Sequence, residues 1–510
     1  MTTERELYPE LPAELRRLTP RSLIRFVGPG LIIASVTIGS GELVLASRGG
    51  SVFGYTMLWC FLVAGIFKAI QVYSSGRYLA LTGEHPMTSW ARMPGPRYWF
   101  PLLIALPTVL VMPIAFSGIS EILGGYIHEL TGGANQGAAV GPFEHQEFWE
   151  NVWAACVISG CFLLALYSTL TMLERVSVVV LGILLVCVIC SVVVSQPDLP
   201  AFFQGLLVPQ VNDYEPWVTE ASKEFIGRSP WLEVALYLTA VGGGTYDYVG
   251  YIGMMREKKW GLSDRGVTSR EQIAAAIEQQ GADGEQQLER ARKWTRAPLI
   301  DTSFSFAIVI LVTLLFAVLG SELLHSRQQV VDNARLLSQQ EVFLTELSPS
   351  LKWVYRCGVF LAFIGTLYGA FAIYQQTVVE SVRALRSKEL TAGQETTIRR
   401  ATLAYCFLGG QVMMWLPQTV AGNVIERMTF GAIIGGAASC GLWCIAMLWS
   451  DRRGLPAALR MRWPLWLMTL LGGIWRYDER CAPRIFLVHH LRGDLEHPVD
   501  RLPFSIPPRV

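Results

Sequence analysis

Charged residues are scarce in this 510-residue chain. Asp, Glu, Lys and Arg make up 16% of the residues and hydrophobic residues 52%, whereas charged residues account for about a quarter of a soluble globular protein. The formal net charge is +1, so no overall positive field attracts nucleic acid. This composition argues against a soluble enzyme, a disordered chain and a nucleic-acid-binding protein, and it is typical of a polytopic membrane protein.

The sequence also lacks the motifs of an enzyme or of a cofactor site. Its seven histidines have no metal-binding spacing, and it contains no nucleophile–base motif. Cys187 and Cys190 form a C-x-x-C inside an apolar run without a nearby histidine, so we interpret the cysteines as small buried hydrophobes. We therefore expect no enzymatic activity and no cofactor. Residues 1–25 lack the apolar core of a signal peptide and are predicted to form a cytosolic tail.

The sequence does contain a series of long apolar runs, and a spanning helix needs about 20 mostly apolar residues. We predict ten spans, at residues 26–47, 54–79, 99–125, 152–171, 176–195, 231–255, 299–320, 353–380, 401–416 and 428–449. They form a first five-helix repeat at 26–195, an outside linker at 196–230 and a second five-helix repeat at 231–449. The C-terminal region at 450–510 contains a shorter apolar run at 462–475, which is either an eleventh span or an interfacial helix.

The distribution of basic residues predicts how the chain is oriented. The 126–151 linker contains no Lys or Arg, whereas the 256–297 linker contains nine. Because cytosolic loops are rich in basic residues, we expect the 256–297 linker, the N-terminus and the C-terminal tail on the cytosolic side. The expected location is a bacterial-type inner or plasma membrane.

Glycine clusters interrupt the first and sixth predicted spans. Gly39, Ser40 and Gly41 lie in the middle of the first, and residues 242–244 are three glycines in the middle of the sixth. Glycines destabilise a helix, and the freed backbone groups then need a partner, which bound solute, ion or water can supply but lipid cannot. Paired interruptions in two halves of a chain are typical of a transporter binding site between inverted repeats. We predict that the spans are unwound near 39–41 and 242–247.

An acidic residue accompanies each cluster: Glu42 in the first span and Asp247 in the sixth. An ionised carboxylate at mid-bilayer costs at least about 2.5–3.5 kcal/mol, which makes it a candidate functional group. Two carboxylates and freed carbonyls suit hard divalent cations such as Mg²⁺, Mn²⁺ or Ca²⁺, although the same acids are able to take up protons. We therefore predict that Glu42 and Asp247 are metal ligands. The other predicted substrate-binding residues are Gly39, Ser40, Gly41, Gly244, Thr245, Tyr246 and Tyr248.

Six segments, in their order along the chain, resemble the Nramp (natural resistance-associated macrophage protein) metal-ion transporter family. They are GPGLIIASV before the first glycine cluster, RYLALTGE at 77–84, ISEILGGYI at 119–127, LERVSVVVLGIL at 173–184, LIDTSFSFAI at 299–308 and YGAFAIYQQTVVES at 368–381. The resemblance implies an all-α, leucine-transporter-like fold of two inverted five-helix repeats with discontinuous spans 1 and 6. It also implies transport of divalent metal cations, often coupled to protons.

The chain departs from the family pattern at the site itself. The family's Asp-Pro-Gly-Asn in span 1 corresponds to residues 39–42, so its aspartate ligand is replaced by Gly39 and its asparagine by Glu42. The family's Met-Pro-His in span 6 corresponds to residues 246–248, so its methionine and histidine are absent. The loss of the thioether implies a weaker preference for soft transition metals.

A second departure lies in the third predicted span. The family's aspartate there is replaced by Gly118, whereas the glutamate three residues later is kept as Glu121. The resemblance therefore makes Glu121 the candidate residue for proton coupling.

Together these patterns predict a secondary transporter that moves a hard divalent cation, Mn²⁺ or Mg²⁺ being favoured, by alternating access with or without coupled protons. One alternative is a transporter of a small organic solute or amine, which Tyr246, Tyr248 and Tyr251 would favour as cavity-lining residues. Another is a non-transporting membrane receptor, although no signalling domain is recognisable. The expected partners are the transported ion or solute, the lipid bilayer and protons as a coupled ion, with no nucleic acid.

Overall fold

The computed structural model describes residues 6–16, 26–133, 137–167, 170–279, 282–330, 336–346, 348–386, 389–418, 422–432 and 438–474. In these residues the regular secondary structure is helical, and strand-type pairing is limited to one isolated bridge between Val140 and Phe143. The predicted all-α class is therefore confirmed.

Within the described residues, five helical stretches are long and apolar enough to cross a membrane. They are Gly41–Thr82, Trp99–Leu130, His145–Tyr167, Ala282–Arg327 and Pro349–Leu385. The number rises to six if Leu185–Ser195 and Leu199–Leu207, which meet at an angle of 119°, form one bent span. The chain is thus a polytopic membrane protein. The predicted span 26–47 changes helix type at Ile38, and the predicted span 231–255 is divided at its glycine cluster.

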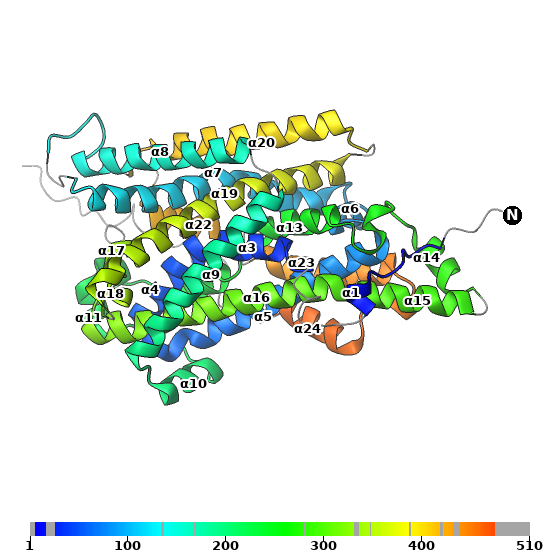
Figure 1. The fold of residues 1–510 in the computed structure, drawn as a ribbon, viewed down its shortest axis with the longest axis horizontal. Coiled ribbons are helices and arrows are strands. Elements are labelled where there is room, and N and C mark those ends of the chain that lie inside the picture. Colours follow the sequence, from blue (N-terminus) through cyan, green and yellow to red (C-terminus); the bar gives the residue numbers. More distant parts are fainter. Residues whose placement is uncertain are drawn as a thin grey trace, which may run out of the picture.

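The long helices form two groups (Figure 1). In one group, α7 (Trp99–Leu130) packs against α8 (His145–Tyr167) and α20 (Ala392–Met414), and α19 (Lys352–Leu385) contacts all three. In the other group, α5 (Leu58–Thr82) packs against α16 (Arg296–Leu319). Helix α9 (Leu170–Ser195) contacts both α16 and α19, so it joins the two groups.

The first and sixth predicted spans lie between these two groups. The first begins with α3 (Pro29–Thr37), which contacts both α16 and α19. The sixth consists of α12 (Pro230–Ala240) and α13 (Thr245–Glu257), and α13 contacts both α19 and α5. This position, enclosed on two sides, keeps the interrupted spans away from the periphery of the bundle.

Shorter helices connect or flank these elements. They include α1 (Ala13–Arg16), α4 (Ser47–Phe53), α6 (Pro86–Trp90), α10 (Leu199–Leu207), α11 (Pro216–Ala221), α14 (Arg270–Ile277), α15 (Ala282–Trp294), α17 (Leu336–Gln339), α18 (Val342–Thr345), α22 (Val424–Ala432), α23 (Ala438–Gly454) and α24 (Trp463–Ile474). The 12 residues of α24 rise about 18 Å, well short of a hydrocarbon core about 30 Å thick. Residues 475–510 lie outside the described residues, so the eleventh span or interfacial helix at 462–475 stays a prediction.

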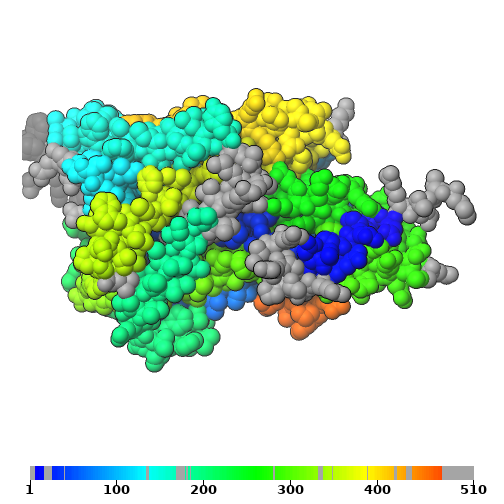
Figure 2. Space-filling model, viewed as in Figure 1, coloured from blue at the N-terminus to red at the C-terminus, as the bar shows by residue number. Residues whose placement is uncertain are grey.

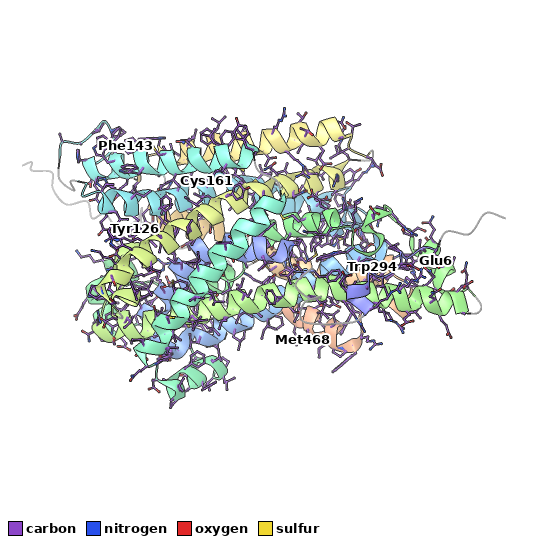
Figure 3. All side chains as sticks on the ribbon, in the orientation of Figure 1. Glu6, Tyr126, Phe143, Cys161, Trp294 and Met468 are labelled. Carbon is purple, nitrogen blue, oxygen red and sulfur yellow. The ribbon has the colours of Figure 1, made fainter. Side chains whose placement is uncertain are left out.

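The 256–297 linker forms α14 and α15 and holds the N-terminal segment. The backbone N–H of Tyr8 donates to Oε1 of Gln287 at 2.8 Å, and Glu6 is paired with Arg290. The hydrogen bond from Arg290 holds the pKa of the Glu6 carboxyl below its usual value, so the pair stays charged at neutral pH. Figure 2 shows the dark-blue N-terminal residues lying against the green surface of α14 and α15, and Figure 3 places Glu6 and Trp294 at the same end of the molecule.

Candidate functional site

The sixth span is broken over four residues between α12 and α13. Val241 is extended, and Gly242 and Gly243 have φ angles of +70° and +80°, which residues with a side chain rarely adopt. The predicted break is confirmed, but it is shorter than expected. Thr245–Asp247 are not unwound, because they form the first turn of α13.

The first span is not unwound, and the prediction of an unwound stretch at 39–41 is wrong. At Ile38 the α-helix passes into a nine-residue π-helix, η1 (Ile38–Ala46), and η1 continues directly into α4. A π-helix widens the turn but keeps its backbone groups bonded within the helix, and it is often found at functional sites. The interruption in this span is therefore a change of helix type, not a loss of helix.

Gly39 stands at the position where the resemblance implies that an aspartate ligand has been lost. Close packing against a neighbouring helix explains why a glycine is found there. Its N–H donates to Oγ1 of Thr366 on α19 at 3.2 Å. A Cβ atom at Gly39 would lie 2.4 Å from that oxygen and 3.3 Å from the carbonyl oxygen of Ala362. Gly39 thus allows η1 to approach α19, as small residues do between membrane helices.

We expect Gly39→Ala to destabilise the protein by about 1–3 kcal/mol, because the added methyl group overpacks the contact with Thr366. Thermal unfolding of the purified variant measures this loss. Gly160→Ala on α8 is the matched control, because a Cβ atom there meets no atom within 4 Å. In the double variant Gly39→Ala/Thr366→Ala the added methyl group no longer meets Oγ1, so the two losses should be less than additive. Fully additive losses would contradict this explanation.

Two buried carboxylates hold backbone amides of the sixth-span break. Oε1 of Glu42 accepts from the N–H of Gly242 at 3.0 Å, and Oδ2 of Asp247 accepts from the N–H of Gly244 at 2.7 Å. The other oxygen of each carboxylate is buried and has no hydrogen-bond partner among the described residues. The structure therefore places both sequence-predicted acids at one break, although they come from different spans.

The carbonyl oxygens of the break are also held by side chains. The hydroxyl of Tyr248 donates to the carbonyl oxygen of Gly242 at 2.9 Å. The ammonium group of Lys68 on α5 donates to the carbonyl oxygens of Val241 and Gly243 at 2.5 Å and 2.7 Å. The expectation that solute, ion or water supplies these partners is therefore wrong for all three carbonyl groups.

A cavity of about 90 Å³ lies beside the break. A water molecule needs roughly 10–15 Å³ of such space, so the cavity is large enough for an ion with several waters. Thr37, Tyr246, Asp247 and Tyr374 contribute polar side chains to its lining, and Asp247 is the one carboxylate among the described residues that line it. Much of the remaining lining is aliphatic, from η1, α7 and α19.

The predicted substrate-binding residues are divided between the cavity and its surroundings. Gly41, Tyr246 and Asp247 line the cavity. Gly244 precedes α13 as its N-cap residue, and Glu42 lies behind the lining against the amide of Gly242. Ser40 is part of η1, and its side chain lies outside the described residues.

Three hydroxyl groups that the sequence analysis placed at the site form hydrogen bonds to other parts of the protein. Thr245 accepts from Oγ of Ser439 at 2.8 Å, and Tyr248 donates to the break as described above. Tyr251 donates to Oδ2 of Asp301 at 2.6 Å. None of these three is among the residues that line the cavity. Of the three tyrosines that the organic-solute alternative placed there, Tyr246 is the one that lines it. Its ring packs edge-on against that of Tyr374, with the ring centroids 5.7 Å apart.

Comparisons with known proteins find a family that part of the chain resembles. Residues 30–222 match the model of the natural resistance-associated macrophage protein-like (Nramp) family. A divalent metal cation transporter of Listeria welshimeri is 24% identical over 194 residues, which are 37% of this chain and 39% of that protein. The metal transporter Nramp3.1 of Populus trichocarpa is 25% identical over 204 residues, which are 38% of this chain and 36% of that protein.

The similarity of fold to a solved structure covers most of the chain. The solved structure of a mutant of the Eremococcus coleocola manganese transporter aligns with 91% of this chain and 86% of its own, with a TM-score of 0.57 and 13% sequence identity. In sequence, residues 30–222 of the chain are Nramp-like. The sequence match to the Listeria and Populus relatives spans less than two thirds of their length, whereas the common fold extends through both halves of the chain.

Methionine is present in the cavity, although it is absent from the position of the family's Met-Pro-His motif in span 6. Met428 on α22 lines the cavity. A Cβ atom at Gly118 would lie 2.8 Å from Cγ of Met428 and 3.2 Å from its Sδ, so the glycine makes room for this side chain. A thioether from another helix therefore borders the cavity, because residues far apart in the sequence complete it.

The proton-coupling candidate Glu121 forms a buried ion pair with Arg427 on α22. Arg427 also donates to the carbonyl oxygen of Met413 at 3.1 Å. Oε1 of Glu121 has no hydrogen-bond partner among the described residues. Ile119 and Met428, which are close in sequence to the two charged residues, line the cavity, so the ion pair lies near one side of it.

Sequence reasoning missed three charged residues. It assigned no functional role to Arg427, to Asp301 or to Lys68. Each is a charged residue in or beside an apolar run, which is the signal that marks it for attention. The backbone groups that Lys68 and Asp301 bind come from other spans, so only the fold identifies them.

Proposed function

We propose that this protein is a secondary transporter that moves a divalent cation through the cavity at the broken sixth span. The observation that carries the proposal is Asp247, a buried carboxylate that lines the cavity and has one oxygen without a hydrogen-bond partner among the described residues. A buried charge of this kind is stabilised by a cation. The names of the relatives, a divalent metal cation transporter and a manganese transporter, support the same substrate class.

The side chains around the cavity favour Mn²⁺ among the divalent cations. Asp247 and Thr37 offer oxygen atoms, which hard cations prefer, and Met428 adds a thioether, which suits a transition metal better than Mg²⁺. The described residues contain no cluster of three or more His, Cys, Asp and Glu side chains arranged as a metal site. We therefore propose that the ion keeps part of its water shell in the cavity.

We further propose that transport follows alternating access between two five-helix repeats, at 26–195 and 231–449, with protons as the coupled ion and Glu121 as the carboxylate that takes them up. The distribution of basic residues supports a cytosolic N-terminus, and we propose a bacterial-type inner membrane as the location. In a fold of this kind the ion is expected to pass from one side to the other as the helices around the break change their packing.

A small organic amine is a second candidate substrate. The edge-on pair of Tyr246 and Tyr374 borders the cavity together with Asp247. Aromatic faces and a single carboxylate are suited to an ammonium group. The amount of aliphatic lining also favours this candidate over a fully hydrated ion.

Uptake by proteoliposomes distinguishes the two candidates. We expect vesicles that contain the purified protein to accumulate Mn²⁺ well above protein-free vesicles, and to take up Mn²⁺ faster than Mg²⁺ or Ca²⁺. Quenching of a trapped metal-sensitive dye measures the influx. If folded protein takes up none of the three ions but does accumulate a radiolabelled alkylamine, the cation proposal is wrong and the amine proposal replaces it.

A further inference from the structure

The end of α12 presents a group of carbonyl oxygens to one side chain from another span. The ammonium group of Lys68 lies 2.7 Å from the carbonyl oxygen of Thr239, 2.5 Å from that of Val241 and 2.7 Å from that of Gly243. An ammonium group has three N–H donors, and these three carbonyl oxygens lie within hydrogen-bonding distance of it. Lys68 is buried, with an exposed fraction of 1%.

The three oxygens have the character of a cation site. They belong to the last turn of a helix and to the break that follows it, where carbonyl groups have lost their partners and the helix dipole is negative. Carbonyl oxygens that converge in this way at a broken membrane helix coordinate Na⁺ in transporters built from inverted repeats. Here a protein side chain supplies the positive charge.

The charge of Lys68 is compensated at the same break. Glu42 and Asp247 hold the amides of Gly242 and Gly244, while Lys68 holds the carbonyl groups between and before them. A buried ammonium group is costly unless charges and hydrogen bonds of this kind surround it. The break is therefore held by two acidic side chains on its amides and by one ammonium group on its carbonyl oxygens.

We propose that Lys68 is a tethered cation that permanently fills a monovalent-cation position in the broken sixth span. The break then keeps its shape without a free Na⁺ or K⁺ ion, and Lys68 acts as a positioning residue for Asp247. This inference does not rest on transport of a divalent cation, because it concerns the stability of the break itself.

Removing the Lys68 side chain should convert the protein into one that depends on a monovalent cation. Lys68→Ala frees the three carbonyl oxygens and leaves room for an ion. Lys68→Met is the matched control, because it removes the charge but fills the same space with an apolar chain. The measurement is the Tm of the full-length purified protein with a chelator of divalent cations, in NaCl, KCl or choline chloride at equal ionic strength.

We expect the Tm of the unsubstituted protein to be the same in the three salts. The Tm of Lys68→Ala should fall in choline chloride and recover by about 5 °C or more in NaCl or KCl, because a ligand that binds only the folded state stabilises it. The Tm of Lys68→Met should fall and stay low in all three salts. If Lys68→Ala aggregates in choline chloride, its recovery as a monodisperse protein in NaCl or KCl is the equivalent result.

Three results would overturn the proposal. The first is a Tm of the unsubstituted protein that rises in NaCl or KCl over choline chloride. The second is a Lys68→Ala variant as stable as the unsubstituted protein in choline chloride. The third is a destabilised or aggregated Lys68→Ala variant that neither Na⁺ nor K⁺ improves, since Lys68 would then only complete a set of hydrogen bonds.

Discussion

Replacement of Asp247 by asparagine is expected to weaken Mn²⁺ binding by about 100-fold or more. Two unit charges 4 Å apart interact by about 4 kcal/mol at an effective dielectric constant of 20, and each 1.4 kcal/mol is about a tenfold change in affinity. Asparagine keeps the shape of the side chain and an oxygen that can accept from the N–H of Gly244, so the variant should fold. Calorimetric titration of the purified protein with Mn²⁺ measures the change.

Two other carboxylates provide a graded comparison. Glu42→Gln should weaken binding less than Asp247→Asn, by about tenfold, because Glu42 lies behind the cavity lining. Asp301→Asn removes the charge of another fully buried carboxylate, which contacts Gly28, Gly30 and Tyr251 instead of the cavity, and should leave the affinity unchanged. Unaltered affinity in Asp247→Asn would show that this carboxylate only stabilises the break.

Asp301→Ala is expected to cause the largest loss of stability, about 3–5 kcal/mol. Asp301 is fully buried on α16 and accepts from the N–H of Gly28 at 2.9 Å, from the N–H of Gly30 at 3.0 Å and from the hydroxyl of Tyr251. Alanine leaves these donors buried without an acceptor and removes a negative charge from the N-terminus of α3. Thermal unfolding, or the yield of monodisperse protein, measures the loss.

Milder changes at the same contact test that explanation. Asp301→Asn keeps an oxygen that can accept from both amides, so it should lose much less stability than Asp301→Ala. Tyr251→Phe removes one hydrogen bond and should lose about 1 kcal/mol. If Asp301→Ala unfolds at the temperature of the unsubstituted protein, Asp301 does not anchor α3 to α16.

The same fold that anchors α3 also explains why two similar glycine clusters behave differently. Both clusters predicted an unwound span. In the sixth span the prediction holds because Gly242 and Gly243 adopt positive φ angles, and their freed backbone groups find Lys68, Tyr248 and two carboxylates. In the first span Gly39 instead allows close contact with Thr366 on α19. Glycine permits both outcomes, and the neighbouring helix decides between them.

The amino-acid sequence by itself determined the class of the protein. Long apolar runs with few charges require helices in a membrane, because lipid cannot satisfy free backbone groups, and three consecutive glycines weaken the sixth span locally. Only the tertiary structure decided which partners meet at the break. Lys68, Glu42 and Met428 come from three different spans, and their contacts depend on how helices pack. A hydropathy pattern records the burial of each helix but not the neighbour that each buried side chain faces.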